Sequence, residues 1–403
     1  MAEIILIQIS GDDRPGVTSA LTGVLASYGV DILDIGQSVI HNQLILGILI
    51  RIPKESESAP VIKDVMFKGY ELGVNVKFRP IKEDTYGLWV SEQGKPRHIV
   101  TLVADRITGK QISKITGIIA ENGLNIDIIN RLSGRIPQDG GPAPRYACVE
   151  FSVRGIPHEL DKIRSAFLQM ASEDQVDIAL QEDNAFRRNR RIVAFDMDST
   201  LIQTEVIDEL AKAAGSGEEV SRITESAMRG EIDFQESLRR RLRTLKGLDA
   251  SIMDKIAAQL PMTEGAERLI SNLRKFGYKT AIISGGFTYF GENLKKKLGV
   301  DYVHANKLIV RDGKLTGEVE GAIVDGPRKA QLLREIADKE NISLQQVIAV
   351  GDGANDLPML SIAGLGIAFH AKPKVKKGAG QAISHYGLDS ILYLIGLRDR
   401  ETD

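Results

Sequence analysis

The sequence predicts an α/β protein in which two small β-α-β-β-α-β domains precede a doubly wound parallel sheet with a helical cap. A weak internal repeat, offset by about 93 residues, occupies the front of the chain. Behind it, apolar runs alternate with helical patterns, as parallel strands joined by helices require. We expect small domains at 1–81 and 97–181, linkers at 82–96 and 182–191, and the sheet domain at 192–403.

The composition is that of an ordinary cytoplasmic enzyme or regulator. With 403 residues, 43% of them apolar, the chain can bury several separate cores. A net charge of -2 gives no electrostatic reason to expect nucleic acid or an anionic membrane as partner. No apolar run approaches the roughly 20 residues that span a bilayer, and the first residues lack the pattern of a signal peptide.

Each copy of the repeat starts with a strand that turns into a helix through a short loop. The loop is Gly-Asp-Asp-Arg-Pro-Gly at 11–16 and Ala-Asp-Arg-Ile-Thr-Gly at 104–109. Each helix then ends at a glycine suited to a left-handed C-cap, Gly29 or Gly123.

The remainder of each copy completes a ferredoxin-like order. Strand, helix and strand patterns follow at 43–52, 57–72 and 75–78 in the first copy, and at 145–153, 157–172 and 175–179 in the second. Residues 134–144, rich in glycine and proline, predict a long mobile loop in the second copy.

These copies resemble the ACT domain, a small module that commonly binds amino acids and pairs edge to edge with another copy. The first loop matches the motif of that family well, whereas the second lacks its proline. A loop ahead of a helix N-terminus attracts a carboxylate through free amides. Asp12 and Asp105 could equally serve as caps of their helices.

The stretch at 192–201 is the most informative in the chain. An apolar run typical of a buried strand ends in two carboxylates one residue apart, Asp196 and Asp198. Open α/β sheets bind ligands at the carboxyl ends of their strands. Two aspartates there would repel each other without a cation between them, and Mg²⁺ takes such oxygen ligands and often holds phosphate too. Taken alone, the Asp-Met-Asp triplet at 196–198 is as compatible with a solvated turn as with a cation site.

Two further strand patterns and one helix start place more polar groups at the same edge. The strand at 278–286 ends in Ser284 and Gly285, and the segment at 346–356 ends in Asp352, Asn355 and Asp356. Lys329 stands near the start of a helix that opens at 325–330. A last strand is expected at 364–369, and a hairpin at 307–311 and 314–320.

These groups make chemical sense as a site for phosphoryl transfer, which requires holding a dense anion and stabilising its charge. Asp196 and Asp352 would hold Mg²⁺, and Asp196 would attack phosphorus to form an aspartyl-phosphate. Asp198 would protonate the leaving oxygen and then deprotonate the attacking water. Lys329, Ser284 and the Gly285 amide would bind the phosphate oxygens.

Together, in their order and spacing, these signals resemble the haloacid dehalogenase superfamily of phosphatases. The resemblance implies a Rossmann-like sheet and metal ligation by Asp196, the backbone carbonyl of Asp198 and Asp352. It implies that Asp356 supports the metal through water. An aspartate two places after the nucleophile is the phosphatase form of that family, whereas its ion-pumping ATPases have threonine there.

The mostly helical insertion at about 205–276 predicts a cap that closes over the site and excludes water. Its motifs resemble those of the phosphoserine phosphatases. On that resemblance Glu205 receives the substrate ammonium and Arg241 its carboxylate, while Phe234 and Met228 shield the bound amino acid. The residue types alone also allow other roles. Glu205 could be an acid in the first turn of a helix, the arginines at 239–241 could form a solvated helix face, and Phe234 and Met228 could be core residues.

The resemblance implies a cytoplasmic, Mg²⁺-dependent hydrolase that converts O-phospho-L-serine to L-serine and phosphate, the last step of L-serine biosynthesis. Asn355 joins the expected substrate contacts. The ACT modules would bind L-serine as a feedback effector within a homodimer. Two alternatives stay open, a phosphatase of the same fold for another small phosphorylated metabolite, and an amino-acid sensor without turnover.

Overall fold

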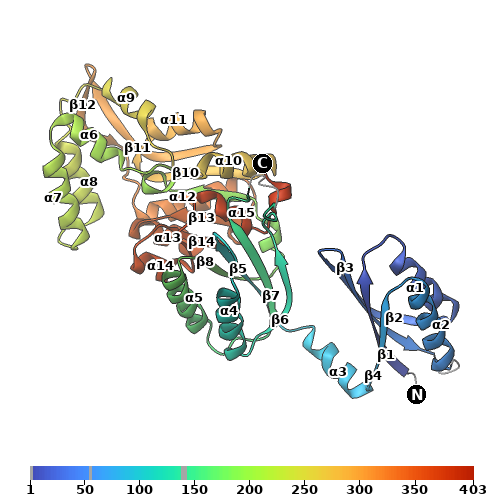
Figure 1. Cartoon of the computed structure of the whole chain (residues 1–403). Helices are drawn as coiled ribbons and strands as arrows, with labels where there is room; N and C mark the ends of the chain where they lie inside the picture. Colours follow the sequence, from blue (N-terminus) through green and yellow to red (C-terminus); the bar gives the residue numbers. More distant parts are fainter. Residues whose placement is uncertain (1–2, 54–56, 138–142) are drawn as a thin grey trace. The chain divides into compact units, whose positions relative to one another are not determined.

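The computed structural model describes residues 3–53, 57–137 and 143–403. The chain divides into two compact units, Met1–Lys95 and Pro96–Asp403, which we describe separately (Figure 1). Part of the loop predicted at 134–144 lies outside the described residues. Within the described segments, no helix has the length and apolar character that a membrane crossing requires.

The first unit is a four-stranded antiparallel sheet with two helices. The strand order β2-β3-β1-β4 is that of the predicted β-α-β-β-α-β fold, which is therefore confirmed. Alternate residues of β1, namely Ile5, Ile7 and Ile9, are buried in the unit's core with the buried faces of the helices. The elements are β1 (Glu3–Asp12), α1 (Val17–Ser27), β2 (Asp31–Ile40), β3 (Gln43–Ile52), α2 (Ser58–Glu71) and β4 (Asn75–Ile81), followed by α3 (Glu83–Glu92) within the segment expected as a linker.

The second unit begins with the second copy of this fold, in the order β6-β7-β5-β8. Its elements are β5 (Arg97–Ala104), α4 (Gly109–Glu121), β6 (Asn125–Arg131), β7 (Ala147–Arg154), α5 (Leu160–Asp174) and β8 (Asp177–Glu182).

The helix caps correct one expectation. Neither Asp12 nor Asp105 is an N-cap, because α1 begins after Gly16 and α4 begins after Thr108. Thr108 forms a capping box with Gln111. The Asp12 carboxylate instead accepts a hydrogen bond from the Gln43 side chain.

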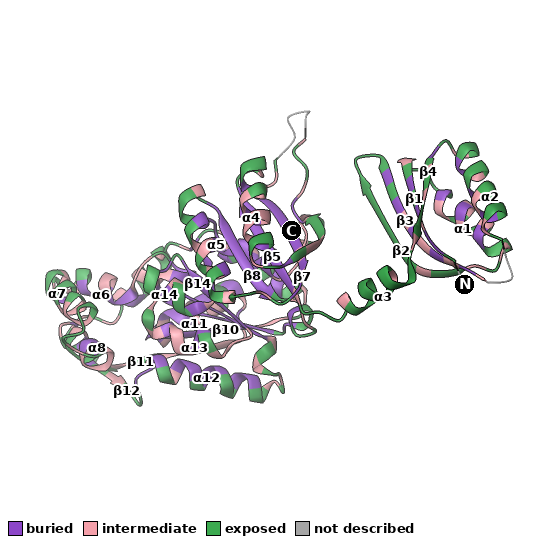
Figure 2. Ribbon diagram, turned by 90° about the horizontal axis from the view of Figure 1, so that it is seen from below, coloured by how far each residue is buried: buried purple, intermediate pink, exposed green. Residues whose placement is uncertain are grey.

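The rest of this unit is a seven-stranded sheet in the order β12-β11-β10-β9-β13-β14-β15, parallel except for β12. The fully buried β9 lies between β10 and β13, so the order reverses at this point. Open α/β sheets bind ligands beyond the strand ends at such a reversal. Figure 2 shows the buried strands in purple. The strands are β9 (Ile192–Phe195), β10 (Lys279–Phe287), β11 (Tyr302–Arg311), β12 (Lys314–Glu320), β13 (Val347–Gly351), β14 (Leu365–Phe369) and β15 (Gln381–Ile383).

Helices cover this sheet and form the insertion. The covering helices are α10 (Ala266–Lys275), α11 (Thr288–Leu298), α12 (Gly326–Lys339), α13 (Leu357–Ile362), α14 (Pro373–Ala379) and α15 (Ile391–Leu394). The insertion contains α6 (Val206–Ala214), α7 (Gly217–Met228), α8 (Phe234–Arg243) and α9 (Ile252–Gln259). The cap expected at about 205–276 ends before α10. That helix packs against β10 and α11 and therefore belongs with the sheet.

The predicted hairpin is present as β11 and β12, joined at Asp312 and Gly313, which both have positive φ. It reaches the insertion, because the Gly247 amide donates to the Leu315 carbonyl and the Leu315 amide donates to the Leu248 carbonyl, each at 2.8 Å.

Buried polar contacts join the second ACT-like fold to the sheet domain. The Asp177 carboxylate accepts hydrogen bonds from the backbone amides of Ser384, His385 and Tyr386 at 2.7, 3.2 and 3.2 Å. The Gln381 side-chain amide bonds both backbone groups of Leu180, on strand β8. Because burial raises the pKa of Asp177 while these amides lower it, the carboxylate depends on its three donors.

Replacing Asp177 by alanine should therefore destabilise this unit. Three backbone amides, of which that of Tyr386 is buried, would lose their acceptor, at a cost of about 2–4 kcal/mol in the free energy of unfolding. Urea unfolding followed by circular dichroism measures this. Asp161→Ala is the control, since the Asp161 side chain is 96% exposed. Equal midpoints for the two variants would contradict the role assigned to this junction.

Candidate active site

The loop after β9 carries the first two predicted site residues. The Asp196 amide donates to the Val350 carbonyl at 2.9 Å, which ties the loop to β13. The Asp196 carboxylate accepts from the Met197 amide through one oxygen and from Lys329 through the other, both at 2.6 Å. Ser199 has a φ of 55°, a left-handed conformation that reverses the chain toward the insertion.

Lys329 lies in the first turn of α12 with no exposed surface. Its ammonium donates to Asp196 and to Asp356, each at 2.6 Å. Burial alone would lower the pKa of Lys329, but the two carboxylates raise it above the ordinary value. The lysine is therefore charged and fixes two acids that would otherwise repel each other.

Three acids converge at this point with the spacing of a metal site. One ligand oxygen from each of Asp196, Asp352 and Asp356 lies within 4.8 Å of the others. Burial and then the charge of Asp196 raise the pKa of Asp352 to about 8 and that of Asp356 to about 7. Thr200 donates to Asp352 at 3.1 Å. An all-oxygen set with excess negative charge suits a hard divalent cation.

This cluster differs in one member from the predicted ligand set. It contains the side chains of Asp196 and Asp352, as expected, and adds that of Asp356. The backbone carbonyl of Asp198, the third expected ligand, stays a prediction.

Asp198 and Glu205 both lie close enough to Asp196 for its charge to affect them. The Asp198 carboxylate accepts from the Val206 amide at 3.0 Å, and Glu205 accepts from the Ser199 hydroxyl at 3.0 Å. Burial, then Glu205 and Asp196, raise the pKa of Asp198 well above its usual range. Burial also raises the pKa of Glu205. A raised pKa favours the protonated form, and a protonated carboxyl group can donate a proton to a leaving oxygen.

Ser284 and Gly285 lie near the end of β10, close to Asp198. Ser284 is fully buried and accepts from the Gly286 amide at 2.9 Å. A Cβ on Gly286 would lie 2.4 Å from an Asp198 oxygen and 3.2 Å from the Ser284 hydroxyl. Glycine at 286 therefore lets these two side chains approach each other.

Asn306 is a positioning residue that the sequence patterns do not reveal. Its buried amide donates to the Gly285 carbonyl at 2.7 Å and accepts from the Val324 amide at 2.9 Å. It thus joins the Ser284 loop to the segment that leads into α12. No local signal marked it, because Asn306 directly precedes the strand expected at 307–311.

The structure distinguishes Arg241 from its neighbours on α8. Arg239 donates to Gln235 and Arg240 pairs with Glu236, and both arginines are exposed. The Arg241 Nε is buried and has no hydrogen-bond partner among the described residues. Burial lowers the pKa of Arg241, whereas Glu205, Asp208 and Asp198 raise it. A charged group with an unpaired buried donor can bind an anion.

The remaining predicted contacts, Phe234, Asn355 and Met228, differ in their surroundings. Phe234 covers Gly285, where a Cβ would lie 2.9 Å from the ring. Asn355 is half-buried in the turn between Asp352 and Asp356, with its side chain over Gly353. Met228 is 64% exposed and contacts Lys372 through its sulfur.

The chain matches three family models. Residues 3–79 and 96–181 each match an ACT domain, and residues 193–361 match a haloacid dehalogenase-like hydrolase.

Curated relatives match along the whole chain. A phosphoserine phosphatase from Streptomyces coelicolor is 40% identical over 399 residues, covering 99% of this chain and 93% of the relative. The phosphoserine phosphatase SerB2 of Mycobacterium tuberculosis is 40% identical over 400 residues, covering 99% and 94%.

Solved structures agree with this match. A HAD-family hydrolase from Salmonella enterica serovar Typhi aligns with a TM-score of 0.64 at 29% identity, over 74% of this chain and 99% of that one. A probable phosphoserine phosphatase from Vibrio cholerae aligns with a TM-score of 0.58 at 33% identity, over 74% and 86%.

Protons should compete with a divalent cation at the acid cluster. Asp352 and Asp356 have raised pKa values of about 8 and about 7, so both acids bind protons as the pH falls through this range. Metal ligands must be deprotonated, so the affinity for Mg²⁺, used as the test cation, should fall about tenfold per pH unit just below pH 8 and more steeply below about pH 7, where the second acid also binds a proton. Calorimetric titration from about pH 9 to about pH 6.5 measures this.

Asp352→Asn is the matched control, because it removes one titrating ligand and should weaken binding while flattening its pH dependence. Equal Mg²⁺ affinity of the unaltered protein at both ends of the range would contradict the cluster as the binding site.

Proposed function

The chain belongs to the phosphoserine phosphatases, and on that premise we propose that it hydrolyses O-phospho-L-serine to L-serine and phosphate through an aspartyl-phosphate. The observation that carries the proposal is the buried Lys329 that joins Asp196 to Asp356 beside Asp352. The reaction would be the last step of L-serine biosynthesis, in the cytoplasm. Phosphate release from a panel of phosphorylated metabolites, with and without Mg²⁺, tests it.

The cation would be Mg²⁺, held by Asp196, the Asp198 carbonyl and Asp352, with Asp356 in support. When bound, it offsets the repulsion between the Asp196 carboxylate and the phosphate dianion. The acid cluster supports this choice because it offers oxygen ligands alone.

Asp196 would attack phosphorus. Its carboxylate is held in place by the Met197 amide and by Lys329, so little reorganisation precedes the attack. The phosphorus–oxygen bond to serine breaks as the bond to the Asp196 oxygen forms. The leaving oxygen would take its proton from Asp198, whose raised pKa supports a protonated resting state. Asp198 would then accept a proton from the water that attacks the aspartyl-phosphate.

The phosphate oxygens would be bound by Lys329, Ser284, the Gly285 amide and Asn355. These groups come from separate elements, α12, β10 and the turn after β13. Fixed donors of this kind stabilise the charge that spreads over the phosphate oxygens in the transition state.

The amino-acid part of the substrate would lie between Glu205 and Arg241. Glu205 would receive the ammonium and Arg241 the carboxylate, beneath Phe234 and Met228. The unpaired buried donor of Arg241 supports this assignment, because it leaves the guanidinium available to a carboxylate.

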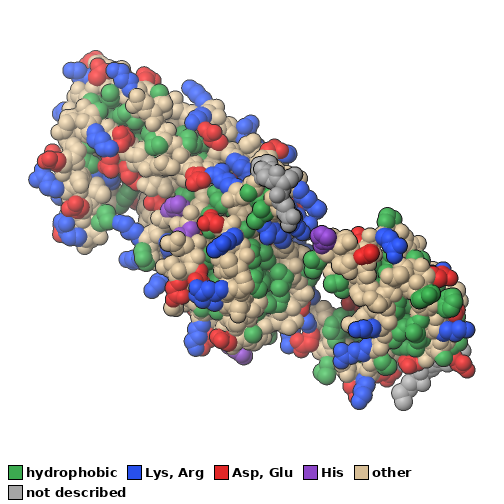
Figure 3. All heavy atoms as spheres, in the orientation of Figure 1, with side chains coloured by type: hydrophobic (Ala, Val, Ile, Leu, Met, Phe, Trp, Pro, Cys, Tyr) green, Lys and Arg blue, Asp and Glu red, His purple; other side chains and the backbone are tan. Residues whose placement is uncertain are grey.

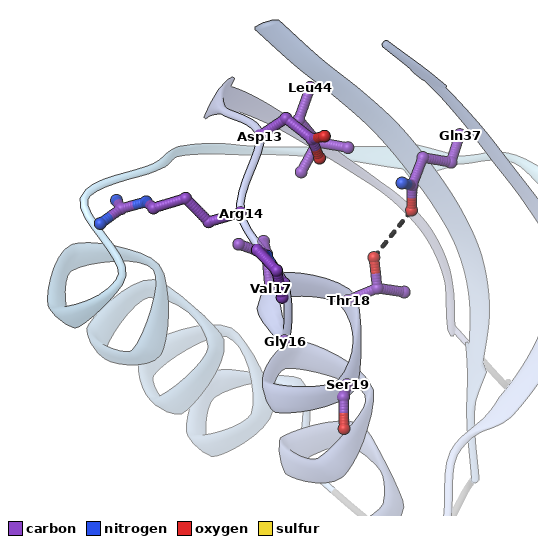
Figure 4. Close-up of a pocket in the computed structure, with 9 residues that line it drawn as sticks. Asp13, Arg14, Gly16, Val17, Thr18, Ser19, Gln37 and Leu44 are labelled. Carbon is purple, nitrogen blue, oxygen red and sulfur yellow. Dashed lines mark hydrogen bonds between the residues drawn. The ribbon is translucent and has the colours of Figure 1, made fainter. Parts of the chain in front are cut away.

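L-serine would also act as effector at the ACT modules. In the first unit a cavity of about 300 Å³ lies at the N-terminus of α1 (Figure 4). Asp13, Arg14 and Gly16 line it, and Thr18 donates to Gln37 at 2.8 Å across it. A helix N-terminus with polar neighbours suits the carboxylate of a small amino acid.

A homodimer would form through ACT edge strands. β2 is an edge strand, and Ile32, Ile35 and Ile40 on it are exposed, as is Ile45 on β3. Exposed hydrophobic side chains are visible on this unit (Figure 3). An unpaired edge with exposed isoleucines favours pairing with another strand.

Arg241→Ala tests the substrate assignment. It should lower kcat/KM for phosphoserine about a hundredfold, because a charge-assisted contact to the carboxylate is lost. Hydrolysis of p-nitrophenyl phosphate, which has no carboxylate, should change less than about threefold. Arg240→Ala, on the exposed face of the same helix, is the control. Equal losses on both substrates would favour another small phosphate as the substrate.

Serine should inhibit the enzyme and raise its melting temperature, because a ligand that binds only the folded state stabilises it. Thr18→Val, which removes the donor to Gln37, should reduce both effects and leave basal turnover unchanged. Thr22→Val, one turn further along α1, is the matched control. If serine changes neither turnover nor melting of the unaltered protein, it is not the effector.

A further inference from the structure

A side-chain hydrogen bond joins the insertion to the helix that carries Lys329. Gln235, the second residue of α8, donates through Nε2 to Asp325 Oδ2 at 2.7 Å. Asp325 is the N-cap of α12. The two residues are 90 positions apart, and both are half-buried.

The orientation of both partners is fixed by other contacts. The Gln235 Oε1 accepts from Arg239 at 3.0 Å, which leaves the amide NH₂ group for Asp325. The Asp325 Oδ1 accepts from the Arg328 amide at 3.0 Å, and its carbonyl accepts from the Lys329 amide at 2.8 Å. Each Asp325 oxygen therefore has a separate partner, and Oδ2 is the one directed to the insertion.

Both ends of this bond adjoin proposed substrate contacts. Phe234, beside Gln235, covers Gly285, and Lys329 lies four residues after Asp325. Arg241 follows Gln235 by six residues on α8, which is about 9 Å along a helix axis. The bond therefore joins α8, which carries Arg241, to the start of α12, which carries Lys329.

We infer that Gln235 is a positioning residue whose bond to Asp325 holds α8 over the site, so that Arg241 and Lys329 bind opposite ends of one substrate. This role rests on the proposed function. Gln235 itself touches no reacting atom. Its loss should impair binding of the amino-acid part of the substrate and leave phosphate chemistry largely intact.

Exchanging donor and acceptor tests the bond. Gln235→Glu keeps the partner for Arg239 but places a carboxylate against Asp325, and kcat/KM for phosphoserine should fall about tenfold or more, mainly through KM. Asp325→Asn should also break the bond, because the NH₂ group of the introduced asparagine would face the NH₂ group of Gln235. In the double variant, the introduced asparagine can still cap α12 through its oxygen while its NH₂ group donates to the introduced glutamate. The KM should therefore return close to the original value.

Three comparisons separate positioning from general damage. Hydrolysis of p-nitrophenyl phosphate should change less than about threefold in every variant. Glu236→Gln, which loses only a surface ion pair with Arg240, should behave as the unaltered enzyme. A double variant no better than Gln235→Glu, or equal losses on both substrates, would overturn the inference.

Hydrogen exchange gives a readout that does not depend on the substrate. Amides of α8 should exchange faster in Gln235→Glu and return toward the original rate in the double variant. Unchanged exchange would refute the positioning role. Failure of the unaltered protein to hydrolyse phosphoserine would refute the proposed function instead, and the exchange data would still decide whether the bond holds α8.

Discussion

Lys329 lies without exposed surface between the carboxylates of Asp196 and Asp356, and the rest of the site depends on these two contacts. Removing an ammonium from water is unfavourable unless opposite charges surround it. Asp352 adds a further acid, so one lysine cannot balance the cluster. A divalent cation would complete its charge. The placement of β9 between β10 and β13 makes this convergence possible, because it brings separate chain segments to one edge.

Sequence reasoning predicted the parts of this site that depend on strand ends. Asp196, Ser284 and Asp352 each follow a recognisable apolar strand, and the carboxyl ends of parallel strands meet at one edge of a sheet. The pairing of Asp356 with Lys329, and the two hydrogen bonds of Asn306, depend on tertiary packing, which no local pattern records.

The burial of side chains in the structure distinguishes residues that the sequence alone could not tell apart. Three adjacent arginines on α8 are alike in sequence, and Arg241 alone among them has a buried donor without a partner in the described residues. The capping role weighed for Asp105 was wrong for a local reason. Thr108 and Gln111 have the spacing of a capping box, so the helix begins three residues later than an Asp105 cap would require.

The central claim is that Asp196 carries the phosphoryl group during turnover. Rapid acid quenching of the enzyme with phosphoserine that bears a radiolabelled phosphate, followed by peptide mapping, tests it most directly. We expect label on the Asp196 peptide, formed only with Mg²⁺ and absent from Asp196→Asn, which should also lose turnover. Turnover at the original rate by Asp196→Asn, or full activity without labelled protein, would contradict it.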